Sequence, residues 1–215
     1  MNQAQRLAAF DAADLYVVIT TAFCGGRPAL EVLDPVLAAG VKLVQMREKD
    51  LGGRALLELA QQFRQRTQAA RALLIIDDRL DIALAAEADG AHLGQDDLPV
   101  EAARRIAPEL ILGASTHSLA EALAAERAGA SYVNIGPIFA TRTKPDAVPL
   151  GPEALGRIAP ALTIPWTTMG GITRDNLHLV LAQGARHPAV MSAVTAAGDP
   201  LAAARELRRL VLGGA

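Results

Sequence analysis

Short apolar runs, several of them rich in β-branched residues, recur roughly every 20 to 30 residues along the chain. Each run is followed by a turn and then by an Ala/Leu/Arg/Glu segment with helical spacing. Because the runs stay apolar on successive positions, they predict strands that are buried on both faces, as in a parallel sheet. The eight predicted strands are Leu15–Thr20, Leu43–Met46, Leu73–Ile76, Gly90–Leu93, Ile111–Ala114, Tyr132–Ile135, Ile164–Met169 and Ala189–Met191.

Helical segments separate these strands, and residues 1–13 predict one extra helix ahead of the first strand. Gly40, Gly129 and Gly184 each stand just beyond a helical segment, where a left-handed residue closes the last turn. Helices are predicted at Gly53–Ala70, Val100–Ala107, Leu119–Ala128, Arg174–Ala182 and Leu201–Leu210, among others.

An eightfold strand and helix alternation favours a closed barrel over an open doubly wound sheet, which usually has fewer strands and a Gly-x-Gly-x-x-Gly turn. That motif does not follow the first predicted strand. The sequence therefore predicts an α/β protein with a single (β/α)8 TIM barrel domain over residues 1–215 and a short helical lead-in. Such barrels carry their active sites in the loops after the strands, so polar residues there are candidates for function.

Composition narrows the class of function. Hydrophobic residues make up 51% of the 215 residues but aromatics only 3%, so Ala, Val, Leu and Ile must build the core. A formal charge of −2 gives no reason to expect nucleic acid or an anionic membrane as partner. No apolar run approaches the roughly 18 residues of a membrane span. Cys24 is the one cysteine of the sequence, so the chain cannot form an internal disulfide. We expect a soluble, cytoplasmic protein that acts on small-molecule substrates. A homo-oligomer is compatible with this sequence.

The second predicted strand ends in cations. Alternation along Gln45 to Asp50 points Gln45, Arg47 and Lys49 to one side. Two cations cannot be buried cheaply without an anion, so they either bind one at the barrel mouth or form structural ion pairs. Arg offers a planar fork and Lys a point charge, and both suit phosphate.

Carboxylates follow the third and fourth strands, as Asp77-Asp78 and Asp96-Asp97. Carboxylates from adjacent strand ends, close to cations, are arranged to hold Mg²⁺ against phosphate oxygens. The alternative for Asp78 and Asp97 is helix capping, because each precedes a helical segment.

The later strands end in small and hydroxyl residues. Ser115 and His117 follow strand five, and the long connection after strand six is rich in hydroxyls and cations, which is typical of a functional loop. Gly170-Gly171 after strand seven and Ser192 after strand eight let backbone N–H groups approach a phosphate.

These motifs occur together and in order over nearly the whole chain, and they resemble the thiamine phosphate synthase family. The resemblance is carried by Gln45-x-Arg47-x-Lys49, Asp78-Arg79, GAHLGQDDL from Gly90, GAST from Gly113, GPIFATRTKP from Gly136, GGI from Gly170 and MSAVT from Met191. It implies a transferase of thiamine biosynthesis that joins hydroxymethylpyrimidine diphosphate to thiazole phosphate and releases pyrophosphate. The implied mechanism is dissociative and assisted by Mg²⁺: pyrophosphate leaves first, and the thiazole nitrogen attacks the resulting cation.

The resemblance also implies residue roles. The pyrimidine diphosphate would be held by Gln45, Arg47, Lys49, Ser115 and Lys144, of which all but Gln45 would also be catalytic. Asp78 and Asp97 would coordinate Mg²⁺. The thiazole phosphate would be held by Thr141, Arg142 and Thr143 and by the backbone at Gly171, Met191 and Ser192.

Asp77 is also expected to bind the substrate, but it departs from the family pattern, which has Asn at this position to help bind the pyrimidine. Two alternatives stay open. A thiazole tautomerase of the same superfamily shares the Gln-x-Arg-x-Lys signal and uses a histidine near the position of His117. A catalytically silent paralogue that binds a thiamine precursor would be consistent with Asp77, whose carboxylate should repel a diphosphate.

Overall fold

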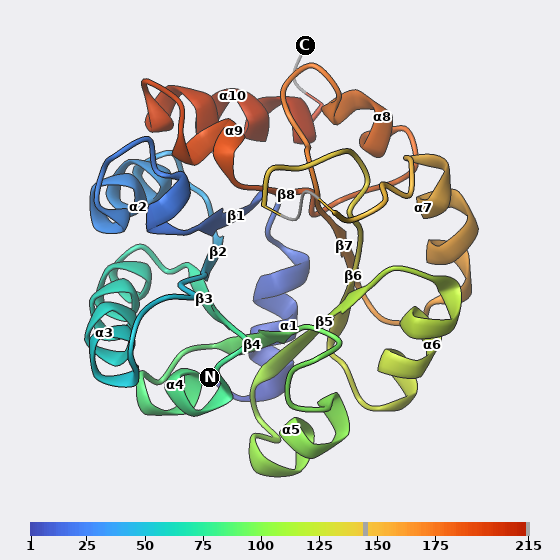
Figure 1. Ribbon diagram of the computed structural model, residues 1–215, viewed down its shortest axis with the longest axis horizontal. Coiled ribbons are helices and arrows are strands. Elements are labelled where there is room, and N and C mark those ends of the chain that lie inside the picture. The colour runs from blue at the N-terminus through green and yellow to red at the C-terminus, as the bar shows by residue number, and fades with distance from the viewer. Residues whose placement is uncertain (144–145, 214–215) are drawn as a thin grey trace.

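The computed structural model of the protein describes residues 1–143 and 146–213. Eight parallel strands form one sheet in the order β7-β6-β5-β4-β3-β2-β1-β8, and a bridge between Thr168 and Pro188 links its two ends into a barrel (Figure 1). The strands are β1 (Tyr16–Ile19), β2 (Leu43–Met46), β3 (Leu73–Asp77), β4 (Gly90–Leu93), β5 (Ile111–Thr116), β6 (Tyr132–Ile135), β7 (Trp166–Thr168) and β8 (Ala189–Val190). The predicted (β/α)8 fold is confirmed.

Helices surround the barrel, as Figure 1 shows. They are α1 (Gln3–Asp11), α2 (Ala29–Ala38), α3 (Gly53–Ala69), α4 (Leu80–Ala85), α5 (Val100–Ile106), α6 (Leu119–Arg127), α7 (Glu153–Ile158), α8 (Leu177–Leu181), α9 (Ser192–Thr195) and α10 (Pro200–Val211), with 3₁₀ turns η1 (Thr21–Phe23) and η2 (Ala159–Ala161). Gly40, Gly129 and Gly184 all have positive φ angles, as their predicted places beyond α2, α6 and α8 require.

Two predicted elements are shorter than expected. The predicted strand Ile164–Met169 is reduced to β7, whose ladder begins after Pro165, a residue without an N–H to donate. The predicted helix Arg174–Ala182 begins only at Leu177, because the Asn176 side chain accepts the Thr173 N–H (2.8 Å) and holds the preceding residues in a turn.

Strand alternation sorts the side chains into an outer and an inner core. Outward residues such as Val17, Val44 and Leu74 pack with the helices. Inward residues at the amino ends of the strands, among them Tyr16 and Tyr132, pack with Phe10 of α1 and fill the lower barrel. The next inward layer is largely polar and forms the floor of a cavity.

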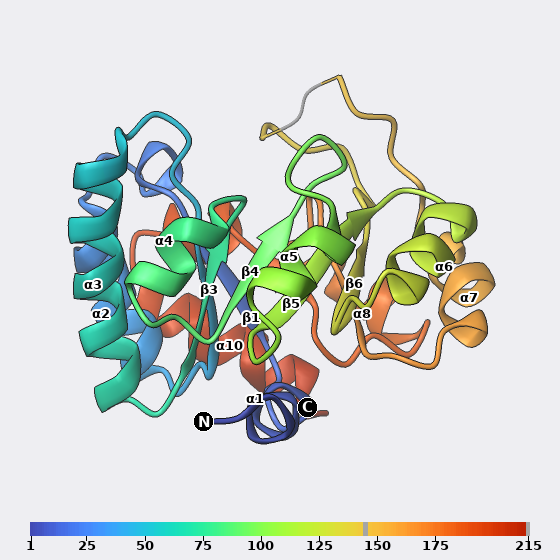
Figure 2. The same ribbon diagram turned by 90° about the horizontal axis from the view of Figure 1, so that it is seen from below.

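Helix α1 lies across the amino ends of the strands, at the end of the barrel opposite the loop after β6 (Figure 2). Arg6 donates to the Glu109 carbonyl (2.8 Å) and lies 3.6 Å from the buried Asp89 carboxylate. The lead-in helix therefore closes the lower end of the barrel. Over the described residues, no helix combines the length and apolar character needed to cross a bilayer.

Candidate active site

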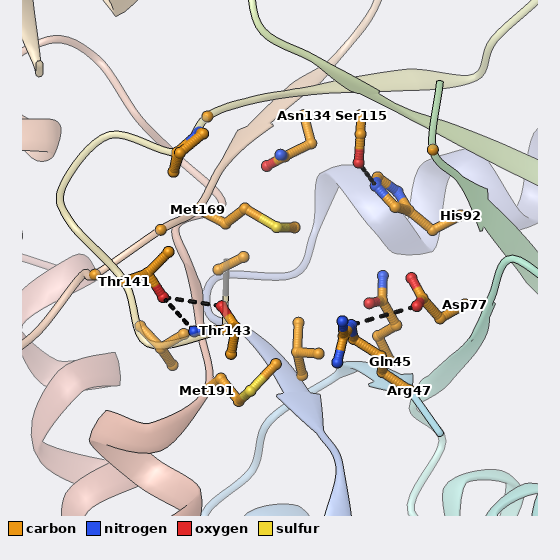
Figure 3. Close-up of a pocket in the computed structure, with 18 of the residues that line it drawn as sticks. Gln45, Arg47, Asp77, His92, Ser115, Asn134, Thr141, Thr143, Met169 and Met191 are labelled. Atoms are coloured by element: carbon orange, nitrogen blue, oxygen red, sulfur yellow. Dashed lines mark hydrogen bonds and ion pairs between the residues drawn. The ribbon is translucent and has the colours of Figure 1, made fainter. Parts of the chain in front are cut away.

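A cavity of about 360 Å³ opens at the carboxyl ends of the strands. It receives side chains from every part of the barrel, as expected for a (β/α)8 site. Figure 3 shows Arg47 and Asp77 on one side, Thr141 and Thr143 across from them, and His92 and Ser115 above. The sequence-predicted residues that line it are Gln45, Arg47, Lys49, Asp77, Asp78, Asp97, Ser115, Thr141, Thr143, Gly171, Met191 and Ser192.

Two predicted residues are not placed in this wall. Arg142 is exposed and does not line the cavity, although its neighbours Thr141 and Thr143 do. Lys144 lies outside the described residues. The side-chain direction of Arg142 depends on the course of an irregular loop, which strand alternation does not determine.

The cations of β2 are paired with acids from β3. Lys49 Nζ lies 2.9 Å from Asp77 Oδ2, and Arg47 Nε lies 3.4 Å from the same oxygen. Lys49 also pairs with Asp78. Gln45, Arg47 and Lys49 thus share one side of the chain, as alternation predicted, and the cations face carboxylates inside the cavity.

Burial and charge shift the acids of this cluster in opposite directions. Burial, followed by the charge of Asp78, raises the pKa of Asp77 to about 6, although Lys49 and Arg47 act to lower it. Burial also acts to raise the pKa of Asp78, but hydrogen bonds with Lys49 and Asp97 outweigh it and hold that pKa below its usual value. For Lys49, the attraction of Asp77 and Asp78 outweighs burial and raises the pKa.

Asp78 and Asp97 meet across the ends of β3 and β4. Asp78 has a left-handed backbone (φ 58°), and its N–H donates to the His92 carbonyl (2.7 Å). The two carboxyl groups lie within hydrogen-bonding reach, and burial together with Asp78 raises the pKa of Asp97. Neither carboxylate caps a helix: Asp97 accepts the Gly94 N–H (2.7 Å), and α4 and α5 have no side-chain cap.

Across the cavity, the loop after β6 is fastened to the end of β7. Ile138 N donates to Met169 O and Phe139 N donates to Gly170 O, each at 2.9 Å. Thr141 Oγ1 lies 2.9 Å from Thr143 Oγ1. Gly171 has φ 64°, and a Cβ there would lie 2.4 Å from the Ala140 carbonyl oxygen. Only glycine allows the two loops to approach this closely.

Four residues in the cavity floor or directly beneath it carry polar contacts that we did not predict from the sequence as site contacts: Tyr16, Tyr132, His92 and Asn134. Gln45 Nε2 donates to Tyr16 OH (2.7 Å), and Tyr16 OH lies 3.1 Å from Tyr132 OH. His92 bridges Tyr132 OH and Ser115 Oγ, with 2.9 Å on each side. The sequence did hold a signal for these residues, because strand alternation points each of them toward the interior of the barrel.

Asn134 is the fourth unpredicted residue. It lies one layer above Tyr132 on β6, lines the cavity, and accepts a hydrogen bond from Thr167 Oγ1 (3.1 Å). This bond leaves the Asn134 amide nitrogen as the donor of that side chain. In the sequence, the apolar neighbours Val133 and Ile135 make this position resemble core.

His117 also lines the cavity, at the end of β5. Its Nδ1 lies 2.9 Å from Glu121 Oε2, and its backbone N–H donates to the same oxygen (2.8 Å). The ring is thus anchored to the first turn of α6.

Comparison with known proteins gives one consistent result. The family model for thiamine monophosphate synthase matches residues 15–194. The thiamine-phosphate synthase of Moorella thermoacetica is 51% identical over 92% of this chain and 95% of its own length, and that of Chloroflexus aurantiacus is 47% identical over 92% of each. A solved structure of thiamine phosphate pyrophosphorylase from Pyrococcus furiosus superposes with a TM-score of 0.89, at 41% identity, over 95% of this chain and 98% of that one.

Proposed function

The chain belongs to the thiamine monophosphate synthase family, and on this premise we propose that it makes thiamine phosphate from hydroxymethylpyrimidine diphosphate and thiazole phosphate. The enzyme is a transferase of thiamine biosynthesis that acts on small molecules. One observation supports the reaction best: a single cavity carries cations and paired carboxylates on one side and a hydroxyl-rich, glycine-fastened loop on the other.

The diphosphate binds on the side of Arg47 and Lys49. Arg47 offers N–H donors in a planar fork, and Lys49 offers a mobile point charge, both beside Asp77 and Asp78. The Ser115 hydroxyl lines the same cavity. The family pattern also assigns Lys144, which lies outside the described residues, to the diphosphate. The side chain of Gln45 contributes polar contacts from the floor.

The described residues fit a divalent cation at Asp78 and Asp97. Four carboxylates, Asp77, Asp78, Asp96 and Asp97, line the cavity against two described cations, so an incoming diphosphate meets an acidic wall. No group of three or more His, Cys, Asp or Glu suited to a metal occurs in the described part of the chain. Mg²⁺ needs no such cage, because it binds through one or two carboxylates together with substrate phosphates. When bound, Mg²⁺ would neutralise charge on the diphosphate.

The chemistry follows from what the cavity holds. The bond between the pyrimidine methylene carbon and the diphosphate oxygen breaks, and both electrons leave with the oxygen. Arg47, Lys49 and Ser115 stabilise this negative charge by ion pairs and a hydrogen bond. The thiazole nitrogen then donates its electron pair to the methylene carbon and forms the new C–N bond, so no nucleophilic side chain is needed.

The thiazole phosphate binds on the side of the β6 and β7 loops. Thr141 and Thr143 provide hydroxyl groups, and Gly171, Met191 and Ser192 leave room for backbone donors at the start of α9. Arg142, exposed beside this wall, adds positive charge near the cavity mouth. The two subsites bring the methylene carbon and the thiazole nitrogen together.

The test is direct synthesis. Purified protein is given both precursors with Mg²⁺, and thiamine phosphate and pyrophosphate are followed by chromatography. We expect one pyrophosphate for each thiamine phosphate. Absence of product with both precursors present would refute the proposed function.

Two lysines at opposite ends of β2 provide a matched pair of variants. Lys49→Gln should lower kcat/KM at least tenfold because it removes a cation from the diphosphate side. Lys42→Gln should leave it unchanged, since Lys42 is exposed at the lower end of the barrel and bonds the Ala70 carbonyl. Equal rates for the two variants would show that the diphosphate subsite is misassigned.

A further inference from the structure

A buried chain of hydrogen bonds runs beneath the cavity floor, from Gln45 on β2 through Tyr16 and Tyr132 to His92 and Ser115. Both tyrosines are fully buried, and neither lines the cavity. Only the two ends of the chain, Gln45 and Ser115, and the edge of His92 face the substrate side.

In the bonds between the two tyrosines, His92 and Ser115, either partner could be the donor. Requiring an acceptor for every buried hydrogen leaves one direction for the whole chain. Gln45 Nε2 can only donate, so Tyr16 accepts from it. The Tyr16 hydrogen then needs an acceptor, and within the described residues the one oxygen in reach is Tyr132 OH. A buried hydroxyl without an acceptor would cost roughly 1 to 3 kcal/mol.

The same accounting continues to the cavity. Because Tyr132 accepts from Tyr16, its own hydrogen must go to His92 Nδ1. A neutral imidazole then carries its one hydrogen on Nε2 and donates it to Ser115 Oγ. Ser115 accepts this bond, and its hydroxyl hydrogen is left to point into the cavity.

The opposite direction leaves one buried hydroxyl hydrogen without an acceptor among the described residues. If His92 carried its hydrogen on Nδ1, Tyr132 would accept from it and donate to Tyr16. Tyr16 would then accept twice, from Gln45 and Tyr132, and its own hydrogen would have no partner among the described residues. Burial raises the pKa of both tyrosines, so neither hydroxyl ionises to avoid the missing hydrogen bond.

We propose that Gln45, Tyr16, Tyr132 and His92 form a one-directional relay of hydrogen bonds that fixes His92 as the Nε2–H tautomer and commits the Ser115 hydroxyl to donate into the cavity. Tyr16, Tyr132 and His92 are positioning residues that act through Ser115. The tautomer follows from the protein alone, whereas the benefit to a diphosphate rests on the proposed function.

A preset donor matters for an anionic leaving group. A hydroxyl that is free to rotate can present either its hydrogen or its lone pairs, and a lone pair would repel a phosphate oxygen. Fixing the hydrogen in advance removes that reorganisation from the reaction, which is the basis of electrostatic preorganisation.

The tautomer is read by ¹⁵N NMR of the histidine rings, with His92→Gln to assign its signals. We expect wild-type His92 to show an unprotonated Nδ1 and a protonated Nε2 without any ligand. A hydrogen on Nδ1 would overturn the proposal, whatever the protein catalyses. If the protein shows the expected tautomer but makes no thiamine phosphate, the proposed function is refuted and the relay is still supported.

Tyr132→Phe tests the link to Ser115, because it removes the donor to His92 Nδ1 and keeps the ring. Pyrophosphate binding with Mg²⁺, measured by calorimetry, should weaken about tenfold in Tyr132→Phe and about tenfold in Ser115→Ala. The double variant should lose little more than either single variant, since both act through one hydroxyl. Losses that multiply to about a hundredfold would show that Tyr132 does not act through Ser115.

Two further variants distinguish an effect on the relay from a general effect on folding or packing. Tyr16→Phe breaks the relay one step earlier and should also let His92 populate both tautomers. Thr116→Val removes a buried hydroxyl from the strand that carries Ser115, where it bonds the Asn134 carbonyl outside the relay (2.9 Å). It should leave the tautomer and pyrophosphate affinity unchanged, and an equal loss in Thr116→Val would assign the Tyr132 effect to packing.

Discussion

Asp77 forms ion pairs with Arg47 and Lys49, the two cations that the proposed diphosphate needs. Its replacement by asparagine should therefore strengthen pyrophosphate binding. The Asp77 carboxylate lies 2.9 Å from Lys49 Nζ and 3.4 Å from Arg47 Nε, and its side chain is only 9% exposed. A phosphate oxygen bound to the same two cations would lie close to this carboxylate. At an effective dielectric constant of 20, two unit charges 4 Å apart repel by about 4 kcal/mol.

Screening reduces this repulsion, because Lys49 is 44% exposed at a water-filled mouth. We therefore expect Asp77→Asn to gain about 1 to 2 kcal/mol in pyrophosphate binding, a roughly 5- to 30-fold lower Kd. Isothermal titration with pyrophosphate and Mg²⁺ measures it. Asp81→Asn is the matched control, since Asp81 pairs with Arg79 and is 64% exposed. Equal or weaker binding by Asp77→Asn would refute the assignment of the diphosphate to Arg47 and Lys49.

The same substitution has a signed effect on stability. The pKa of Asp77 is raised to about 6 from 3.8, so the folded protein binds this proton more tightly than the unfolded chain does. Stability contributed by the protonated form is complete below about pH 4 and is lost as the pH rises through 6. Asparagine carries no such proton, so Asp77→Asn should unfold at a higher temperature than the wild type above pH 6. Below pH 4 the difference should vanish, and calorimetry at several pH values decides.

Three other substitutions give further tests. Gly113→Ala would place a Cβ 2.2 Å from Tyr132 Cζ and 2.5 Å from His92 Nδ1, and we expect a loss of about 1 to 3 kcal/mol, or roughly 3 to 10 °C in Tm; an unchanged Tm would contradict this packing. Gly171→Val should weaken thiazole phosphate binding at least tenfold and pyrophosphate binding little, and equal losses would mean that the subsites are misassigned. Alanine at Asp97 should lower the synthesis rate roughly 100- to 1000-fold and shift the Mg²⁺ dependence upward without unfolding the protein. Full wild-type activity in a chelator would remove the metal from the mechanism.

The barrel was predictable because its signal is local and repeated. Each strand is a short apolar run, and most helices end at a glycine or a turn, so the period of the pattern survives errors of a few residues. The mouth was predictable for a related reason. Alternation along β2 determines that Gln45, Arg47 and Lys49 share one side, and parallel strands bring their carboxyl ends to the same rim.

The floor of the cavity could not be predicted in the same way. Tyr16 and Tyr132 stand at inward positions within apolar strands, where a tyrosine is indistinguishable from ordinary core. What makes them polar contacts is the closed barrel, in which β1 and β6 face each other across the interior and bring together two hydroxyls 116 residues apart. The acid pairs were only half predictable, since the sequence placed Asp78 and Asp97 at strand ends but could not decide between capping and a cation site.

Gly113 shows how register creates the floor. His92 on β4 pairs with Gly113 on β5, and Gly113 pairs in turn with Tyr132 on β6. His92 and Tyr132 are therefore two strands apart, and they meet at 2.9 Å because the residue between them has no side chain. Any larger residue at this position would occupy the space of the hydrogen bond. The glycine in GAST thus has a packing role in the centre of the barrel, in addition to preceding Ser115.

The lead-in helix supports the same floor from below. The ring of Phe10 packs against Tyr132 with centroids 4.6 Å apart, and against His187 at 5.1 Å. Tyr132 is thereby held between the Phe10 ring and His92, and its hydroxyl stays within reach of both Tyr16 and His92. A tyrosine that could tilt would exchange partners and lose the direction of the relay. The segment before the first strand, which carries none of the cavity residues, therefore contributes to the site through the rigidity of one buried ring.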